Sequence, residues 1–161
     1  MTDWNQKIVA DIKLELGGVN DKDLRFLRID EYLRMIKRVD GFAPTCSECN
    51  QFRAEIEQQI KIIGTAVKHI GKERRSFDKH LNQLSGHMKK GHGFYPPYHY
   101  TYSYTFYYSV VAVGLSFLIS LLFPSIDRWF FIVPAFVFGL IAGQLVGGKK
   151  DAKVRADNKL L

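Results

Sequence analysis

Two apolar stretches near the C-terminus decide the fold: residues 107–123, YYSVVAVGLSFLISLLF, and residues 129–146, WFFIVPAFVFGLIAGQLV. Neither contains a charged residue, and a membrane-spanning helix needs about 17–25 mainly apolar residues. The linker of residues 124–128 is short, so the two helices must be antiparallel neighbours. The sequence therefore predicts a transmembrane hairpin, with helices over 107–123 and 129–147 and an external loop between them. The alternative, a buried hairpin of a soluble protein, leaves too little other chain to cover both segments.

Charged residues divide the chain near residue 100. Residues 1–99 contain 17 Lys and Arg against 13 Asp and Glu, whereas the next 48 residues contain only Asp127 and Arg128. The basic tail, residues 148–161, has five bases against two acids. We therefore expect a cytoplasmic domain over residues 1–94, followed by the membrane segments and this tail.

The basic residues also predict the orientation. Lys89 and Lys90 precede the first span, and Lys149 and Lys150 follow the second, whereas the connecting loop holds only Arg128. Positive residues are retained on the cytoplasmic side. The start of the chain, MTDWNQ, has no signal-peptide pattern. We expect an integral protein of the inner or plasma membrane with both termini in the cytoplasm.

Residues 95–106 are rich in tyrosine. Tyrosine favours the headgroup region of a bilayer, so this segment is predicted to form an aromatic juxtamembrane collar. A short strand, or stacking of the rings on nucleic-acid bases, is the alternative. Neither is favoured, and nucleic-acid binding is not expected.

Small residues recur at four-residue steps in both spans, which places them on one helix face and permits close helix packing. They are Gly139, Gly143 and Gly147 in the second span and Ala112, Ser116 and Ser120 in the first. Two interpretations stay open. The faces could pack against each other within one hairpin, or the glycine face could join subunits into an oligomer.

The N-terminal domain is predicted to be an all-α bundle or coiled coil, with helices over about 3–16, 21–39 and 46–90. Its longest pattern is a seam of apolar residues in alternating steps of four and three, which is typical of a coiled coil. The seam consists of Ile56, Ile60, Ile63, Val67, Ile70, Phe77, Leu81, Leu84 and Met88, with Arg74 as its charged member. Gly71 could introduce a turn over residues 71–75, but the unbroken phase of the seam argues against one.

Cys46 and Cys49 form a C-x-x-C pair, and His87 and His92 follow downstream. Together they resemble an incomplete Cys2His2 zinc site, but 37 residues separate Cys49 from His87. A straight helix would hold the two pairs about 55 Å apart. Only a turn near Gly71, or an antiparallel dimer, could bring them together. We favour ordinary cysteines at a helix start, with zinc as the alternative cofactor.

No catalytic constellation is present in the sequence, and the chain is not expected to be an enzyme. The leading hypothesis is a membrane-anchored helical interaction or assembly module. Its expected partners are the lipid bilayer, a second copy or another membrane-complex subunit, and anionic lipid headgroups. The alternative is a small oligomeric membrane effector or channel that is gated by its cytoplasmic domain.

Overall fold

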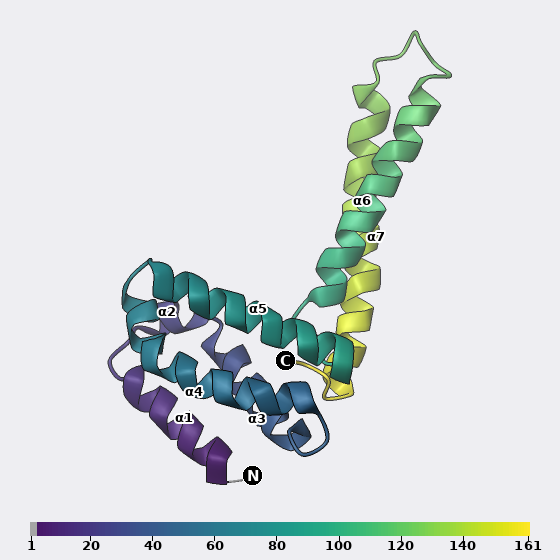
Figure 1. Ribbon diagram of the computed structural model, residues 1–161. Coiled ribbons are helices and arrows are strands. Elements are labelled where there is room, and N and C mark those ends of the chain that lie inside the picture. Colours follow the sequence, from purple (N-terminus) through teal and green to yellow (C-terminus); the bar gives the residue numbers. More distant parts are fainter. Residues whose placement is uncertain (1–2) are drawn as a thin grey trace. The chain divides into compact units, whose positions relative to one another are not determined.

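The computed structural model describes residues 3–161, and this part of the chain contains seven α-helices and no β-strand. The helices are α1 (Asp3–Glu15), α2 (Asp21–Phe26), α3 (Ile29–Phe42), α4 (Ser47–Lys68), α5 (Lys72–His92), α6 (His99–Ser120) and α7 (Trp129–Ala156), shown in Figure 1. They form two compact units: unit 1 extends to Phe94 and includes Leu161, and unit 2 comprises Tyr95–Leu160. The all-α prediction is confirmed.

Unit 1 packs α1, α3, α4 and α5 around one apolar core. The largest fully buried side chains include Tyr32, Phe77, Ile56 and Leu81, and Tyr32 meets Phe77 edge to face at 5.1 Å between ring centroids. Leu161 is also fully buried in this core. The helices are therefore held mainly by apolar side chains that leave water when they pack.

The single helix expected over 21–39 is two helices, because the chain bends at Arg28. Arg28 has a positive φ of 55°, and its guanidinium holds the carboxylate of Glu31 with two hydrogen bonds of 2.5 and 2.8 Å. Leu27 and Ile29, on either side, are both buried. Residues two apart point to nearly opposite faces of a straight helix. The bend lets both of them reach the core.

The helix expected over 46–90 is also two helices, α4 and α5, which are joined by residues 69–71 and pack against each other. The turn lies just before the segment 71–75 that the sequence suggested. Most of the apolar seam is buried in the core of unit 1, but Ile70 lies in the turn and is 97% exposed. The prediction of one continuous seam is therefore wrong at Ile70. The part of the seam in α4 and the part in α5 are both buried in the core of the same chain.

In unit 2, α6 and α7 lie side by side and run in opposite directions (Figure 1). Both are long and apolar enough to cross a membrane. The first helix begins at His99, eight residues before the predicted span, so the tyrosines of the predicted collar from Tyr100 onward are helical rather than extended. The second continues through the basic tail to Ala156.

The glycine face of α7 packs directly on the backbone of α6. A Cβ atom built on Gly139 would lie 2.7 Å from Ser109 Cα, and one on Gly147 would lie 2.5 Å from Thr101 Cα. Gly143 meets Thr105 in the same way. Each four-residue step along α7 is matched by a four-residue step back along α6, which fixes one antiparallel register.

The small residues expected on the first helix lie further along it. Ser116 and Ser120 are buried and Ala112 is half-buried, but the residues nearest the glycines are Thr101, Thr105 and Ser109 instead. The glycine face of α7 is thus covered by α6 of the same chain, as expected if the two faces pack within one hairpin.

Asp151 extends this face by one more four-residue step. Its buried carboxylate accepts hydrogen bonds from the backbone N–H groups of Tyr100, at 3.0 Å, and Thr101, at 2.8 Å, and from the Thr101 hydroxyl at 2.6 Å. The first N–H groups of a helix have no partner within it. Asp151 therefore caps α6 from the neighbouring helix.

Gly143→Ala is expected to destabilise unit 2 by roughly 1–3 kcal/mol, because the added methyl group would overlap the backbone of α6. A Cβ there would lie 2.7 Å from Thr105 N and 2.8 Å from the Tyr104 carbonyl oxygen. Gly148→Ala is the matched control, since a Cβ at Gly148 meets nothing within 4 Å. Thermal unfolding in detergent compares the two. Equal melting temperatures would contradict the close packing.

Candidate metal centre

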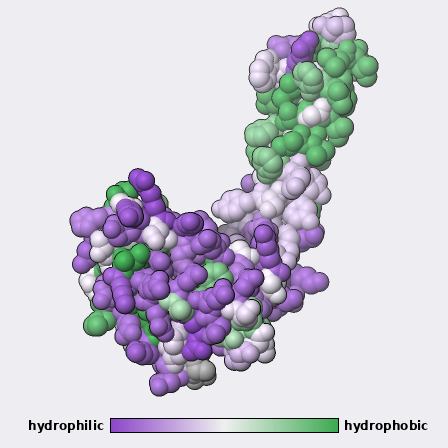
Figure 2. All heavy atoms as spheres, viewed as in Figure 1, coloured by the Kyte–Doolittle hydropathy of each residue, from purple (hydrophilic) through white to green (hydrophobic). Residues whose placement is uncertain are grey.

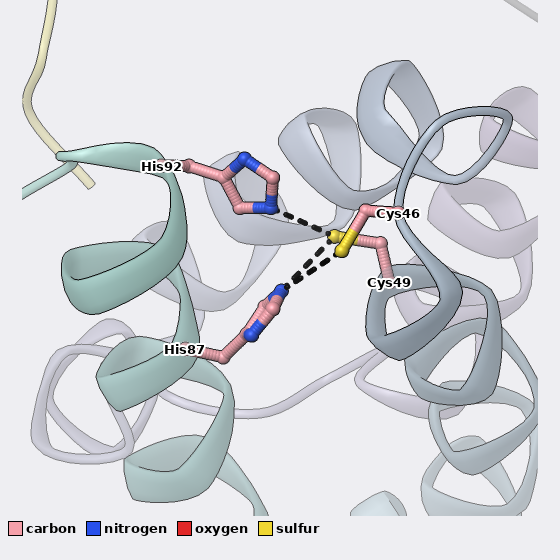
Figure 3. A group of neighbouring side chains, drawn as sticks. All are labelled: Cys46, Cys49, His87 and His92. Atoms are coloured by element: carbon pink, nitrogen blue, oxygen red, sulfur yellow. Dashed lines mark hydrogen bonds between the residues drawn. The ribbon is translucent and has the colours of Figure 1, made fainter.

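Four potential metal ligands meet where the start of α4 lies beside the end of α5 (Figure 3). Cys46 occupies the N-cap position of α4 and Cys49 lies in its first turn. His87 and His92 lie in the last turns of α5. Because α5 folds back along α4 after the turn at 69–71, residues about 40 positions apart in the sequence become neighbours.

The donor atoms are close enough to share one ion. The Nε2 atom of His87 lies 3.3 Å from Cys49 Sγ and 3.6 Å from Cys46 Sγ, and His92 Nε2 lies 3.3 Å from Cys49 Sγ. One donor atom from each residue lies within 4.8 Å of all the others. Zinc–ligand bonds of about 2.3 Å to sulfur and 2.0–2.1 Å to nitrogen put the S and N atoms of a tetrahedral site roughly 3.5 Å apart. The geometry therefore fits zinc.

Glu48, which the sequence analysis did not single out, orients one of the ligands. Its carboxylate Oε2 lies 2.5 Å from Nδ1 of His87. A proton on Nδ1 that is donated to Glu48 leaves Nε2 free to bind a metal. The sequence does show Glu48 between the two cysteines, but only the fold shows that its carboxylate contacts His87.

Aromatic rings pack against both histidines of the centre. Cys49 is fully buried, and the ring of Phe42 stacks on His92 at 4.0 Å between centroids. The ring of Phe52 lies 5.4 Å from that of His87. The low dielectric around the buried Cys49 strengthens the interaction between a cation and this ligand.

Burial also sets the protonation of the metal-free cluster. Burial, together with the hydrogen bond to Cys46 and the charges of Cys46 and Glu48, raises the pKa of the Cys49 thiol to about 12. Burial, followed by the charge of His87, lowers the pKa of His92, which favours the neutral imidazole that a metal requires. Metal binding must therefore release the thiol proton of Cys49.

The number of ligands indicates what a bound metal would do. Two sulfur and two nitrogen donors complete the tetrahedral shell of zinc, whereas catalytic zinc sites keep one position for water or substrate. The cluster therefore fits a structural centre that ties the first turn of α4 to the last turns of α5.

The sequence offered these four ligands only as an alternative that needed a turn near Gly71 or an antiparallel dimer, and the turn is present. His80 lies outside this cluster. That side chain is buried, its Nδ1 lies 3.2 Å from Glu55 Oε2, and burial lowers its pKa although Glu55 acts in the opposite direction. The packing residues of the two apolar helices belong to unit 2 and take no part in this centre.

Comparison of the chain with protein-family models, with curated proteins and with solved structures gave no match.

We expect the purified protein to contain one zinc ion per chain. Cys49→Ser should abolish zinc binding, because it removes the most buried ligand, whereas His69→Gln should leave it unchanged, because His69 lies in the exposed turn after α4. Elemental analysis measures the zinc content. Full zinc content in Cys49→Ser would contradict the assignment.

Glu48→Gln is expected to retain the centre but to weaken zinc binding about 10–100-fold, because it removes the carboxylate that orients His87. Competition with a chromogenic chelator measures this affinity. Glu73→Gln, at the opposite end of α5, is the control. An unchanged affinity in Glu48→Gln would exclude a role for this carboxylate.

Proposed function

We propose that this protein is a membrane-anchored helical interaction module: α6 and α7 cross the membrane as a hairpin, and unit 1 is a cytoplasmic domain stabilised by a Cys2His2 zinc centre. The observation that carries the anchor is the exposed apolar surface of unit 2, which is green in Figure 2. Only 17% of the most apolar window of either helix is buried, whereas the core helix of a soluble protein is mostly buried.

The dimensions of unit 2 support this proposal. Residues 129–148 of α7 carry no charge, and at 1.5 Å per residue they cover about 30 Å, the thickness of the hydrocarbon core of a bilayer. In the register set by the glycines, these residues lie along the whole of α6, both its tyrosine-rich first half and its apolar second half. Lys149 and Lys150 follow immediately, which favours a cytoplasmic location for that end.

The proposed role in interaction applies to the outer surface of unit 1. The apolar seam, which was the expected binding surface, is largely buried inside the unit and so is not available to a partner. The zinc centre would give this surface a fixed shape by holding the ends of α4 and α5 together.

Oligomeric assembly into an effector or channel is the second candidate. It is favoured by an apolar groove of about 540 Å³ between α6 and α7, which includes the small residues Ala112, Ser116 and Ala135. The groove has no ionisable lining residue other than Tyr108. The groove therefore suits another apolar helix better than an ion, which favours oligomeric assembly. Ion flux through vesicles that contain the purified protein would show that such an assembly is a channel.

The proposed topology predicts that a cysteine in the loop between α6 and α7 faces the outside. Ser125→Cys should react with a membrane-impermeant maleimide on intact cells. Ser76→Cys, equally exposed but on unit 1, should react only after the membrane is permeabilised. Labelling of Ser76→Cys on intact cells would contradict a cytoplasmic unit 1.

The proposed interaction role predicts that the protein does not purify as a single chain. In mild detergent, light scattering corrected for the detergent should give a mass above one protein chain of 18.5 kDa, or a stable complex with another protein. A strict monomer without any co-purifying partner would contradict the proposal.

A further inference from the structure

Two exposed apolar side chains lie at the end of unit 1 that contains the turn between α4 and α5. Ile70 is 97% exposed and Phe26, at the end of α2, is 74% exposed. Both border one hollow of about 490 Å³, which Val19 and Val67 also line. Isolated exposed apolar residues are common on proteins, but these two share one site, which we call the apolar tip.

Basic residues outnumber acidic ones around the apolar tip. The segment 68–75 contains Lys68, Lys72, Arg74 and Arg75 against Glu73, while Asp23 also lines the hollow and Asp78 pairs with Arg74. Lys68, Lys72 and Arg75 are exposed, and the guanidinium of Arg74 lies 4.9 Å from the centre of the Phe26 ring. The tip therefore combines apolar side chains with a local excess of positive charge.

We propose that the apolar tip docks on the anionic cytoplasmic face of the membrane to which the protein is anchored. Ile70 and Phe26 enter the boundary between headgroups and acyl chains, while Lys68, Lys72 and Arg75 contact anionic headgroups. This inference rests on the proposed membrane crossing of unit 2, which keeps unit 1 near the bilayer and so raises the effective concentration of the membrane surface.

Charge and size both favour a membrane over a protein partner. The cytoplasmic leaflet carries negative surface potential that attracts basic segments within a Debye length. A stable protein interface needs about 800 Å² from each partner, and two exposed apolar side chains are too few for its centre. Shallow insertion into a bilayer combines burial of apolar side chains with electrostatic attraction to anionic lipids, and the tip offers both.

The test uses the full chain in lipid nanodiscs. The chain has two tryptophans, Trp4 and Trp129, which are both replaced by Phe. Ile70→Trp then introduces one fluorescent reporter at an exposed side chain. Leu14→Trp, at a position that is 80% exposed and lies outside the basic cluster, is the matched control.

In discs of phosphatidylcholine and phosphatidylserine, we expect the Ile70→Trp emission to shift to shorter wavelength and to be quenched by lipids brominated along the acyl chain. Both effects should be lost in discs of phosphatidylcholine alone and after Lys68→Glu with Lys72→Glu. The Leu14→Trp emission should remain that of a tryptophan in water.

Unquenched, water-like emission from Ile70→Trp in anionic discs would overturn the docking proposal and leave a protein as the occupant of the tip. Equal quenching at positions 14 and 70 would overturn it as well. Failure of the protein to enter the discs is a different result, because it would contradict the membrane crossing of unit 2 itself.

Discussion

The reversal of the chain at residues 69–71 is the constraint on which unit 1 depends. It places α5 against α4, so that apolar residues from both helices enter one core with Tyr32 of α3. It also returns His87 and His92 to the two cysteines at the start of α4. Without this reversal, the core would lack one of its walls and the ligand set would be split.

The turn and a bound zinc ion would hold the α4–α5 pair at its opposite ends, with the apolar core between them. The turn closes one end covalently, and the Cys2His2 centre would close the other. Because the four ligands come together only in the folded chain, the free energy of metal binding adds to the free energy of folding. In unit 2, backbone contact at Gly143 and the cap from Asp151 fix the helix pair without any metal.

The sequence predicts the helical class and the apolar segments, because periodicity and composition are local properties. It offers Cys46, Cys49, His87 and His92 as metal ligands only as an alternative to ordinary cysteines at a helix start. It does not predict the reversal, since the apolar seam keeps its phase across the turn at Ile70. The bend at Arg28 was missed because a non-glycine residue with positive φ has no clear local signature. The partners of the glycines were missed because the register of two helices depends on where each begins, and α6 begins at His99.

Zinc K-edge X-ray absorption on the purified, membrane-reconstituted protein tests the central claim most directly. A Cys2His2 centre predicts two sulfur ligands at about 2.3 Å and two nitrogen ligands at about 2.0–2.1 Å. That result would place both cysteines and both histidines on one ion, as the folded α4–α5 pair requires. A spectrum without sulfur ligands, or with four sulfur ligands from two chains, would contradict the account.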